Sequence, residues 1–387
     1  MSRKTSKRTR TRKKQKKQKS PFRVLIIIML LAAAMIIGIS LLVKYRTFSG
    51  YHVDTVIPLS NSEENTQYHV FGNGYLKCAG DGVTYFNEQG IQWNEYYSML
   101  LPVVDISGEY AAVADMGQRN VYLYDKSGYV SRINLSHNIT DVAVSNAGMV
   151  AVSANDGNFN YIEIRDKNGN EIMTEKSVFS SRGFLMDLAL SEDGSRLAAV
   201  FTSIEKGTLG SQIIFYDLSG DGSSSDIIVG TFDQYESVML TTIRFMEDDT
   251  VCAVGDTAIS LYQFSDIPEL VYEDLQIPWE IQSLFFQNDH IGMVVENPES
   301  DSRYQIKVYD LTGNLQLDQG TDFTFTGADF AGSNVFLYSY TECLMYSFAG
   351  VEKFNCPFET RIEALKSTDG RHFVYGTHDS TQFITID

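Results

Sequence analysis

The feature that most constrains this chain is an octet that recurs along it: VYLYDKSG at 121–128, IIFYDLSG at 213–220, IKVYDLTG at 306–313 and, more loosely, YIEIRDKNG at 161–169. Apolar residues alternate along each copy before an Asp and a Gly-containing turn, which is typical of a β-strand followed by a hairpin. A period of about 40–50 residues with several strands per unit predicts the blades of a β-propeller. Successive equivalents of the octet tyrosine lie 37 to 51 residues apart, at Tyr85, Tyr124, Arg165, Tyr216, Tyr262, Tyr309, Tyr346 and Ile386.

Each unit of the repeat contains the same succession of short strands. An inner strand such as ITDVAVS (139–145) leads to a middle strand such as MVAVSA (149–154); the octet is the third strand, and a fourth follows its glycine. Tyr (22) and Phe (23) are abundant and Pro (7) is scarce, as strands prefer. The sequence therefore predicts an all-β domain, an eight-bladed β-propeller over residues 52–387, with seven blades as the alternative.

Closure of the ring is also predicted by the repeat. A four-stranded sheet cannot bury both of its faces alone, so blades must be copied until the ring closes. We expect the octet tyrosine to pack one blade on the next, and the octet glycine to supply a positive φ in the turn. The last unit ends on its third strand, QFITID (382–387), so HVDTVIPL (52–59) is expected to supply the missing outer strand.

The N-terminal region has a different composition. Residues 1–23 contain twelve Lys or Arg and no acidic residue, and residues 24–43 carry no charge. A run of this length spans a hydrocarbon core of ~30 Å, and no small-residue signal-peptide cleavage site follows it. We expect a single transmembrane helix at 24–43 and a linker at 44–51. The positive-inside rule places the basic tail in the cytoplasm and the propeller outside the cell membrane.

The charge of the two parts limits the partners of each. Nineteen of the 31 basic residues and all 49 acidic residues follow residue 43, which gives that part a formal charge of −30. Such a surface does not bind a phosphate backbone, so nucleic acid is excluded as its partner. The basic tail suits anionic lipid headgroups, with a nucleic-acid arm as the alternative.

Several segments resemble known propeller repeats. SEDGSRLAAV (191–200) and STDGRHFVYG (367–376) resemble the Ser-x-Asp-Gly turn of WD40-like and TolB-like propellers, and GYLKCAGDGVTYFNEQGIQW (74–93) resembles the pyrroloquinoline-quinone-type repeat, which favours a tryptophan where Trp93 stands. The layout of basic tail, apolar span and divergent propeller is similar to an uncharacterised family, a domain of unknown function, of membrane-anchored propellers from Gram-positive bacteria. The resemblance implies the fold and carries no assigned activity. Trp279 lies outside the motif, which departs from quinoprotein enzymes.

Catalytic motifs are absent from the sequence. There is no G-x-S-x-G, H-E-x-x-H, P-loop or G-x-G-x-x-G opening a helix, and the six histidines show no ligand spacing. Cys343 and Cys356 flank a predicted hairpin turn at Ala349–Gly350. A two-residue loop would place the two thiols opposite each other and allow a disulfide, whereas a three-residue bulged loop would place them on opposite faces.

Two stretches have spaced oxygen ligands of the kind that bind calcium. Asp217, Ser219 and Asp221 alternate before Gly222, but Ile228 stands where an EF-hand loop needs a glutamate. The second stretch, 156–160, presents Asp156, Asn158 and Asn160 with no glycine after it. We interpret both as hairpin turns, so no cofactor is expected and calcium is the weaker alternative.

Three aspartates form the candidate site. Asp105, Asp141 and Asp187 start the inner strands of the second, third and fourth blades, where they are expected to face the mouth of the central channel and to hold a cation or a cationic ligand. The alternative is that each caps its own turn. The loops 202–212 and 296–303 are expected on the same face and add Glu205, Glu296 and Asp301 as partner-facing residues.

These observations favour a binding or scaffold module at the cell envelope, with an envelope protein or polymer as the partner. An enzyme acting on envelope carbohydrate, as a hydrolase or lyase, is the first alternative. A sensor domain that signals through the span is the second. The missing catalytic motifs favour the binding module, whereas paired acids in a deep pocket would favour the enzyme.

Overall fold

The computed structural model describes residues 45–60, 65–205, 207–220, 227–274 and 276–387, together with residues 26, 28–32 and 35, which are helical. The chain forms two compact units, Met1–Thr47 and Phe48–Asp387. No helix among these described residues is long and apolar enough to cross a membrane. The predicted basic tail at 1–23 and most of the predicted span at 24–43 lie outside the described residues.

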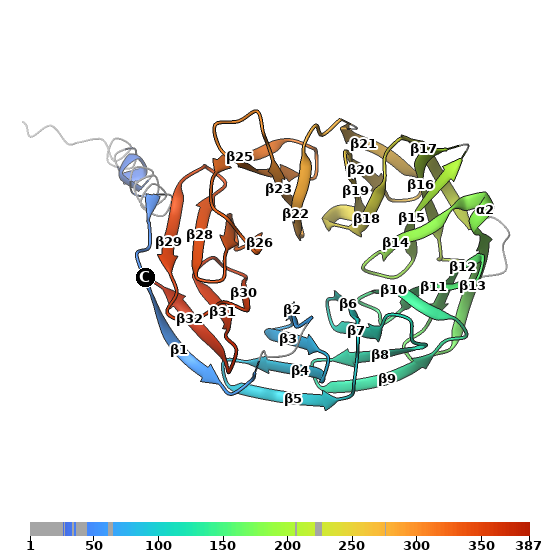
Figure 1. The fold of residues 1–387 in the computed structure, drawn as a ribbon, viewed down its shortest axis with the longest axis horizontal. Helices are drawn as coiled ribbons and strands as arrows, with labels where there is room; N and C mark the ends of the chain where they lie inside the picture. The colour runs from blue at the N-terminus through green and yellow to red at the C-terminus, as the bar shows by residue number, and fades with distance from the viewer. Residues whose placement is uncertain are drawn as a thin grey trace, which may run out of the picture. The chain divides into compact units, whose positions relative to one another are not determined.

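The second unit is an eight-bladed β-propeller, as the sequence predicts, with eight antiparallel four-stranded sheets around a central axis (Figure 1). The first four blades are β2 (Gln67–Phe71), β3 (Gly74–Ala79), β4 (Gly82–Asn87) and β5 (Gly90–Tyr96); β6 (Pro102–Ser107), β7 (Tyr110–Asp115), β8 (Asn120–Asp125) and β9 (Gly128–Asn134); β10 (Asn138–Val144), β11 (Val150–Asp156), β12 (Phe159–Arg165) and β13 (Glu171–Val178); and β14 (Phe184–Leu190), β15 (Arg196–Glu205), β16 (Thr208–Asp217) and β17 (Ile228–Glu236).

The remaining blades continue in chain order, and two short helices, α2 (Phe179–Arg182) and the 3₁₀ helix η1 (Glu247–Asp249), connect strands. Blades five to eight are β18 (Leu240–Phe245), β19 (Thr250–Gly255), β20 (Ile259–Phe264) and β21 (Pro268–Asp274); β22 (Glu280–Gln287), β23 (His290–Glu296), β24 (Tyr304–Asp310) and β25 (Leu315–Thr321); β26 (Gly327–Phe330), β27 (Asn334–Tyr338), β28 (Glu342–Ser347) and β29 (Glu352–Pro357); and β30 (Ala364–Ser367), β31 (His372–Gly376), β32 (Thr381–Ile386) and β1 (Tyr51–Ile57).

The two ends of the propeller chain close the ring. Strand β1 pairs antiparallel with β32, from Tyr51 opposite Ile386 to Ile57 opposite Thr381, and so completes the eighth blade (Figure 1). Tyr51 also stacks on Phe358 at a ring-centroid distance of 4.5 Å. The predicted role of the segment after residue 51 is therefore confirmed.

The octet performs the two structural tasks that its pattern predicts. In the second blade the Asp125 side chain accepts the Ser127 amide at 2.7 Å, and Gly128 has a φ of 124°. A β-bulge immediately before the octet tyrosine, between Leu123 and Tyr124, then re-aims the side chain. Tyr124 consequently packs on the preceding blade, where it stacks on Trp93 at 5.2 Å.

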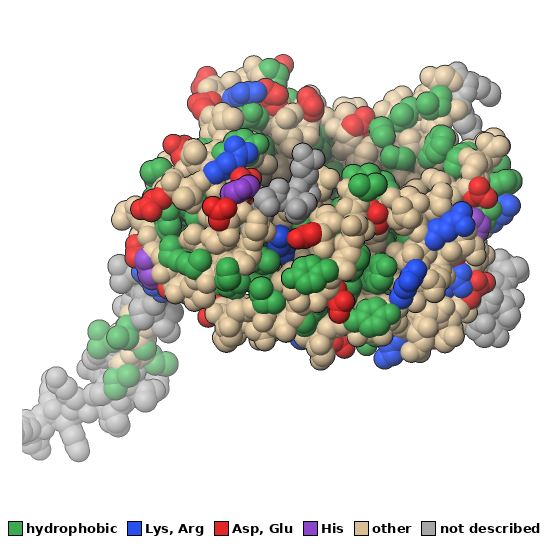
Figure 2. Space-filling view, turned by 60° about the horizontal axis from the view of Figure 1, so that its bottom comes forward, with side chains coloured by type: hydrophobic (Ala, Val, Ile, Leu, Met, Phe, Trp, Pro, Cys, Tyr) green, Lys and Arg blue, Asp and Glu red, His purple; other side chains and the backbone are tan. Residues whose placement is uncertain are grey.

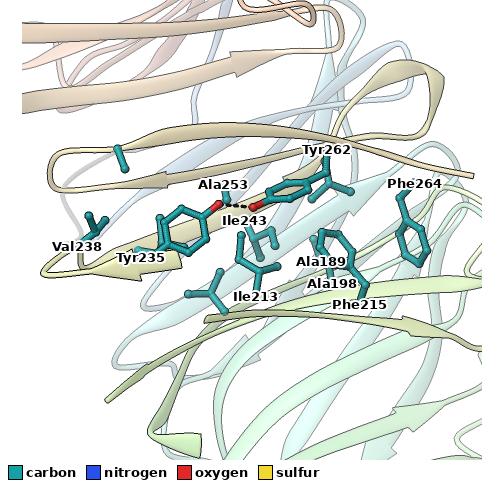
Figure 3. Packing of buried hydrophobic residues seen from close by; sticks show 14 residues of the cluster. Ala189, Ala198, Ile213, Phe215, Tyr235, Val238, Ile243, Ala253, Tyr262 and Phe264 are labelled. Carbon is teal, nitrogen blue, oxygen red and sulfur yellow. Dashed lines mark hydrogen bonds between the residues drawn. The ribbon is translucent and has the colours of Figure 1, made fainter. Parts of the chain in front are cut away.

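The interface between the fourth and fifth blades shows this packing in detail (Figure 3). The octet tyrosine of the fifth blade, Tyr262, is fully buried against Phe215 of the fourth, and its hydroxyl is hydrogen-bonded to that of Tyr235. Alanines at 189, 198 and 253 leave room for these rings. Large and small side chains thus interlock across the interface, as dense interior packing requires.

Two details of the repeat differ from the sequence-based prediction. In the first blade the bulge falls between Tyr85 and Phe86, so Phe86 is the true equivalent of the octet tyrosine and packs on the eighth blade. The predicted long loop at 202–212 is instead an extension of β15 and β16, which pair from Thr202 opposite Ser211 to Glu205 opposite Thr208. The first error arises because Tyr85 and Phe86 are both aromatic and either fits the position of the octet tyrosine. The second arises because the sequence around Gly207 fits a long loop as well as a hairpin.

The hairpin at 343–356 combines both loop geometries considered above. Ser347 donates its amide to the Val351 carbonyl across a three-residue loop, as the bulged alternative requires. A further bulge at Lys353 shifts the register back by one residue, so that Cys343 lies directly opposite Cys356. The four cysteines of the chain are free thiols, three of them buried and Cys356 partly exposed.

Candidate functional site

The innermost strands of six blades line a central cavity of about 810 Å³. The edge of each inner strand faces this space, so consecutive residues line it, as at 104–106 and 284–287. The charged or titratable residues that line the cavity from five different inner strands, here called the channel ring, are His69, Asp105, Arg244, Asp329 and Lys366. Sequence reasoning identified only Asp105 among them.

The three predicted aspartates do not share one level of the channel. Asp105 lies two residues before Ser107, where the turn to the next strand begins, whereas Asp141 and Asp187 lie four residues before Ser145 and Ser191. Asp105 belongs to the channel ring, and it also lines an adjoining cavity of about 220 Å³ together with Asp141 and Asp187. The two levels arise because the β6–β7 turn is shorter than the corresponding turns of the next two blades.

Two of the three aspartates, Asp105 and Asp187, join their blades to the following ones. Asp105 accepts the Val144 amide at 2.7 Å, and Asp187 accepts the Ile243 amide at 2.7 Å. The Leu188 amide donates to Asp187 Oδ1 at 2.8 Å, beside Asp141. Asp105 and Asp187 therefore connect neighbouring inner strands, which neither of the two sequence-based alternatives foresaw. Each of the three also bonds the amide of the residue that follows it, as the local-backbone alternative expects.

Asp141 and Asp187 are also hydrogen-bonded to each other. Burial raises the pKa of Asp187 well above its ordinary value, and the hydrogen bond and repulsion from Asp141 raise it further. Burial likewise raises the pKa of Asp141. Repulsion between two adjacent carboxylates favours a shared proton, so these two groups, here called the carboxyl pair, ionise less readily than two separate aspartates.

The remaining members of the channel ring have defined partners, with one exception. Lys366 forms an ion pair with Asp329, whose other oxygen accepts the Phe330 amide at 2.8 Å. Burial, together with the positive charges of Lys366 and Arg244, lowers the pKa of His69 to about 4, so the His69 imidazole is neutral at pH 7. Arg244 is the exception and is considered below.

The predicted loop residues lie on the periphery. Glu296 forms an exposed ion pair with Arg303 at 3.2 Å, and Asp301 is exposed in the loop between β23 and β24. Glu205 ends β15, at the tip of the extended hairpin. Of these side chains, the two that the structure describes, Glu296 and Asp301, do not line the central cavity.

The two calcium-like stretches form turns in the described part of the chain. Asp217 accepts the Ser219 amide at 2.9 Å, and residues 221–226 lie outside the described residues. Asn160 is engaged on both sides of its amide, with the Gly183 carbonyl and the Leu185 amide. Among the described residues, no group of three or more His, Cys, Asp and Glu side chains is arranged to hold a metal ion, and this includes the three channel aspartates.

Comparison with known proteins extends the assignment of the fold. A family of unknown function (DUF5711) matches residues 44–386, which is nearly the whole chain. The chain belongs to this family. The predicted relation to an uncharacterised propeller family is thereby confirmed, and no curated protein matches this family member in sequence at a significant level.

Two solved propellers align with this member of DUF5711. Sqt1 from Chaetomium thermophilum aligns with a TM-score of 0.54 and 10% identity over 89% of this chain and 100% of that one. The Dos1 propeller aligns with a TM-score of 0.51 and 10% identity over 89% of this chain and 96% of that one. At such low identity the likeness shows the β-propeller fold alone.

Proposed function

We propose that this protein is a binding module of the cell envelope: a β-propeller held outside the cell membrane by a span at 24–43, with a protein partner on one face. The basic tail followed by twenty uncharged residues supports the anchor and its orientation. The same composition supports contact between the tail and anionic lipid headgroups. The resemblance to membrane-anchored propellers of Gram-positive bacteria agrees with this placement.

The distribution of exposed apolar side chains carries the proposal of a partner-binding face. The end of the propeller at which the innermost strands begin is here called the entry face. The three most exposed large hydrophobic side chains of the described propeller all lie there: Leu100 (79%), Tyr96 (78%) and Ile204 (72%). The opposite end carries the short octet turns, which have a repeated structural role.

Leu100 belongs to a small apolar group on the entry face. Leu101 accepts the Met116 amide at 2.9 Å, so these two exposed side chains are neighbours of Leu100. A hollow of about 400 Å³ adjoins them and is lined in part by Tyr97 and Tyr122. Elsewhere, the face seen in Figure 2 has hydrophobic side chains in small groups among polar and charged ones. Aromatic and aliphatic anchors beside a hollow are typical of protein-binding surfaces.

Crosslinking in intact cells tests the partner face. A Leu100→Ser, Ile204→Ser double variant removes two exposed anchors without touching the core, so the fold should persist and capture of the partner should fall several-fold. Ile267→Ser is the matched control, because Ile267 is 66% exposed at the opposite end, in the β20–β21 turn. Equal capture by the double variant, or equal loss in the control, would contradict the proposed face.

Topology is tested separately. Protease added to intact protoplasts should digest the propeller and leave the basic tail. Moving the twelve cations of the tail outward would oppose both the positive-inside rule and the membrane potential. Full protection of the propeller would refute the proposed orientation.

An enzyme is the second candidate because the carboxyl pair lines a cavity. Glycosidase carboxylates stand about 5–9.5 Å apart to leave room for a sugar or a water, whereas Asp141 and Asp187 touch and accept backbone amides. The pair thus fits a structural role better than glycoside hydrolysis. Release of sugar from purified cell-wall polymer by the wild type, and its loss in Asp187→Asn, would establish the enzyme instead.

A further inference from the structure

Arg244 stands apart from the other charged residues of the channel. It lies on the innermost strand of the fifth blade with its side chain exposed to the central cavity, and it also lines the two smaller cavities that adjoin it. Among the described residues it makes no ion pair and no hydrogen bond through its guanidinium group. It is therefore the one cation of the channel ring whose donors are free within the described chain.

Most of the acids that line the cavities beside Arg244 have other partners. Asp105 gives one carboxylate oxygen to the Val144 amide, and Asp329 is held by Lys366. The carboxyl pair favours a shared proton, and Asp187 accepts the Ile243 amide from the following blade. Glu247 and Asp289 line the same cavity, but Asp289 pairs with His290 and neither forms an ion pair with Arg244.

Phe286 orients the guanidinium group. The guanidinium carbon of Arg244 lies 5.4 Å from the centroid of the Phe286 ring, which belongs to the inner strand of the sixth blade. Such a contact holds the planar group by its face and leaves its N–H edge available. An edge of parallel N–H donors matches the two oxygens of a carboxylate or phosphate.

From these observations we propose that the central channel binds a small oxyanion, the carboxylate or phosphate group of a soluble ligand, on the edge of Arg244. The neutral His69 ring lies on the same cavity wall, where its Nε2 is hydrogen-bonded to Gln67 Oε1 at 3.2 Å, so Arg244 is the donor for the anion. The propeller has a formal charge of −30, which opposes the entry of anions in general. Binding must therefore come from local contacts at Arg244, and it is independent of the protein partner proposed for the entry face.

Calorimetric titration of the full chain in mild detergent tests this site with inorganic phosphate and, separately, with citrate. Wild-type protein should bind at least one of the two anions, and competition between them identifies the preferred chemistry. Arg244→Gln should weaken binding tenfold or more. Arg244→Lys keeps the charge but loses the planar pair of donors, and should give an intermediate affinity.

The control is Arg361→Gln, because Arg361 is likewise an exposed arginine stacked on an aromatic ring, at 3.7 Å from the Tyr340 centroid, but lies outside the channel. Its removal should leave the anion affinity unchanged. An unweakened affinity in Arg244→Gln, in protein that melts like the wild type, would overturn the proposal. So would the absence of binding by both anions to the wild type.

Discussion

Asp141 and Asp187, on the innermost strands of neighbouring blades, are hydrogen-bonded to each other through their carboxyl groups. Two ionised carboxylates next to each other in a buried site would repel strongly. The folded protein therefore retains a proton here that the unfolded chain releases near pH 4. This difference in proton binding couples the stability of the inner ring to pH.

The carboxyl pair predicts a pH-dependent loss of stability. Both pKa values are raised by folding, so the free energy of unfolding decreases as pH rises from the ordinary aspartate pKa of about 4 through the raised value of the pair. Asp187→Asn keeps an acceptor for the Ile243 amide and donates to Asp141, and so removes this effect. We expect the melting temperature of the variant, relative to wild type, to increase from pH 4 to pH 8.

Asp217→Asn is the control for this measurement, because hydrogen bonds from Ser219 lower the pKa of Asp217 in an exposed turn. Its melting temperature should show no such gain with pH. Parallel curves for wild type and Asp187→Asn would mean that the pair does not share a proton.

Ring closure by β1 predicts a large effect of a short truncation. Removal of residues 1–57 deletes β1, exposes the edge of β32 and uncovers Phe358 from its stack with Tyr51. We expect a loss of several kcal/mol, seen as a lower melting temperature or as aggregation. Removal of residues 1–45 is the control, since β1 is kept, and it should leave the melting temperature of the propeller unchanged. Equal melting of the two truncations would place ring closure elsewhere.

The third blade replaces the octet tyrosine by a buried ion cluster. Glu163 is 1% exposed, and its two carboxylate oxygens lie 2.6 Å from an Arg165 nitrogen and 2.8 Å from His137 Nδ1. Removing one partner of a buried pair leaves an uncompensated charge, so Arg165→Leu should cost about 3–5 kcal/mol in urea unfolding. The Glu163→Leu, Arg165→Leu double variant should recover much of this loss. A double variant that is less stable than the single one would refute the argument.

Much of the fold was predictable because its determinants are local and repeated. The eight equivalents of the octet tyrosine, the period between them and the missing outer strand of the last unit predicted blade number and ring closure. Phe86 was missed because Tyr85 beside it is equally aromatic, and only a bulge decides which of the two faces the preceding blade. The hairpin at 202–212 was missed because the sequence around Gly207 fits a loop as well as a tight turn.

The candidate site was harder to predict than the fold. Which side chains meet in the channel depends on the register of each inner strand relative to its turn, and the turns differ in length between blades. Asp105 was therefore aligned with Asp141 and Asp187 although it lies two residues nearer its turn. Arg244 and Lys366 carry no local motif at all. The one signal that could have found them is a single basic residue on an inner strand. That signal becomes informative only when the inner strands of the propeller are already known.

The last prediction concerns the cysteines of the seventh blade. Cys343 and Cys356 lie directly opposite each other on β28 and β29, and opposed residues of an antiparallel pair have Cα atoms about 4.5–5.5 Å apart, within the range of a disulfide. Burial raises the pKa of both thiols, so little thiolate is present and spontaneous oxidation should be slow. We expect a mild thiol oxidant to join these two residues and to leave Cys78 and Cys252, which are fully buried, reduced.

Peptide mapping by mass spectrometry measures this outcome. Before oxidation, an alkylating reagent should modify Cys356 alone, because it is the one partly exposed cysteine of the chain. After oxidation, the bridge closes a short hairpin and should raise stability by up to about 3 kcal/mol, less any strain. Cys356→Ser is the control and should show neither the bridge nor the gain. Oxidation that instead joins separate chains through Cys356, with Cys343 left reduced, would show that the two opposed thiols cannot reach each other in the folded blade.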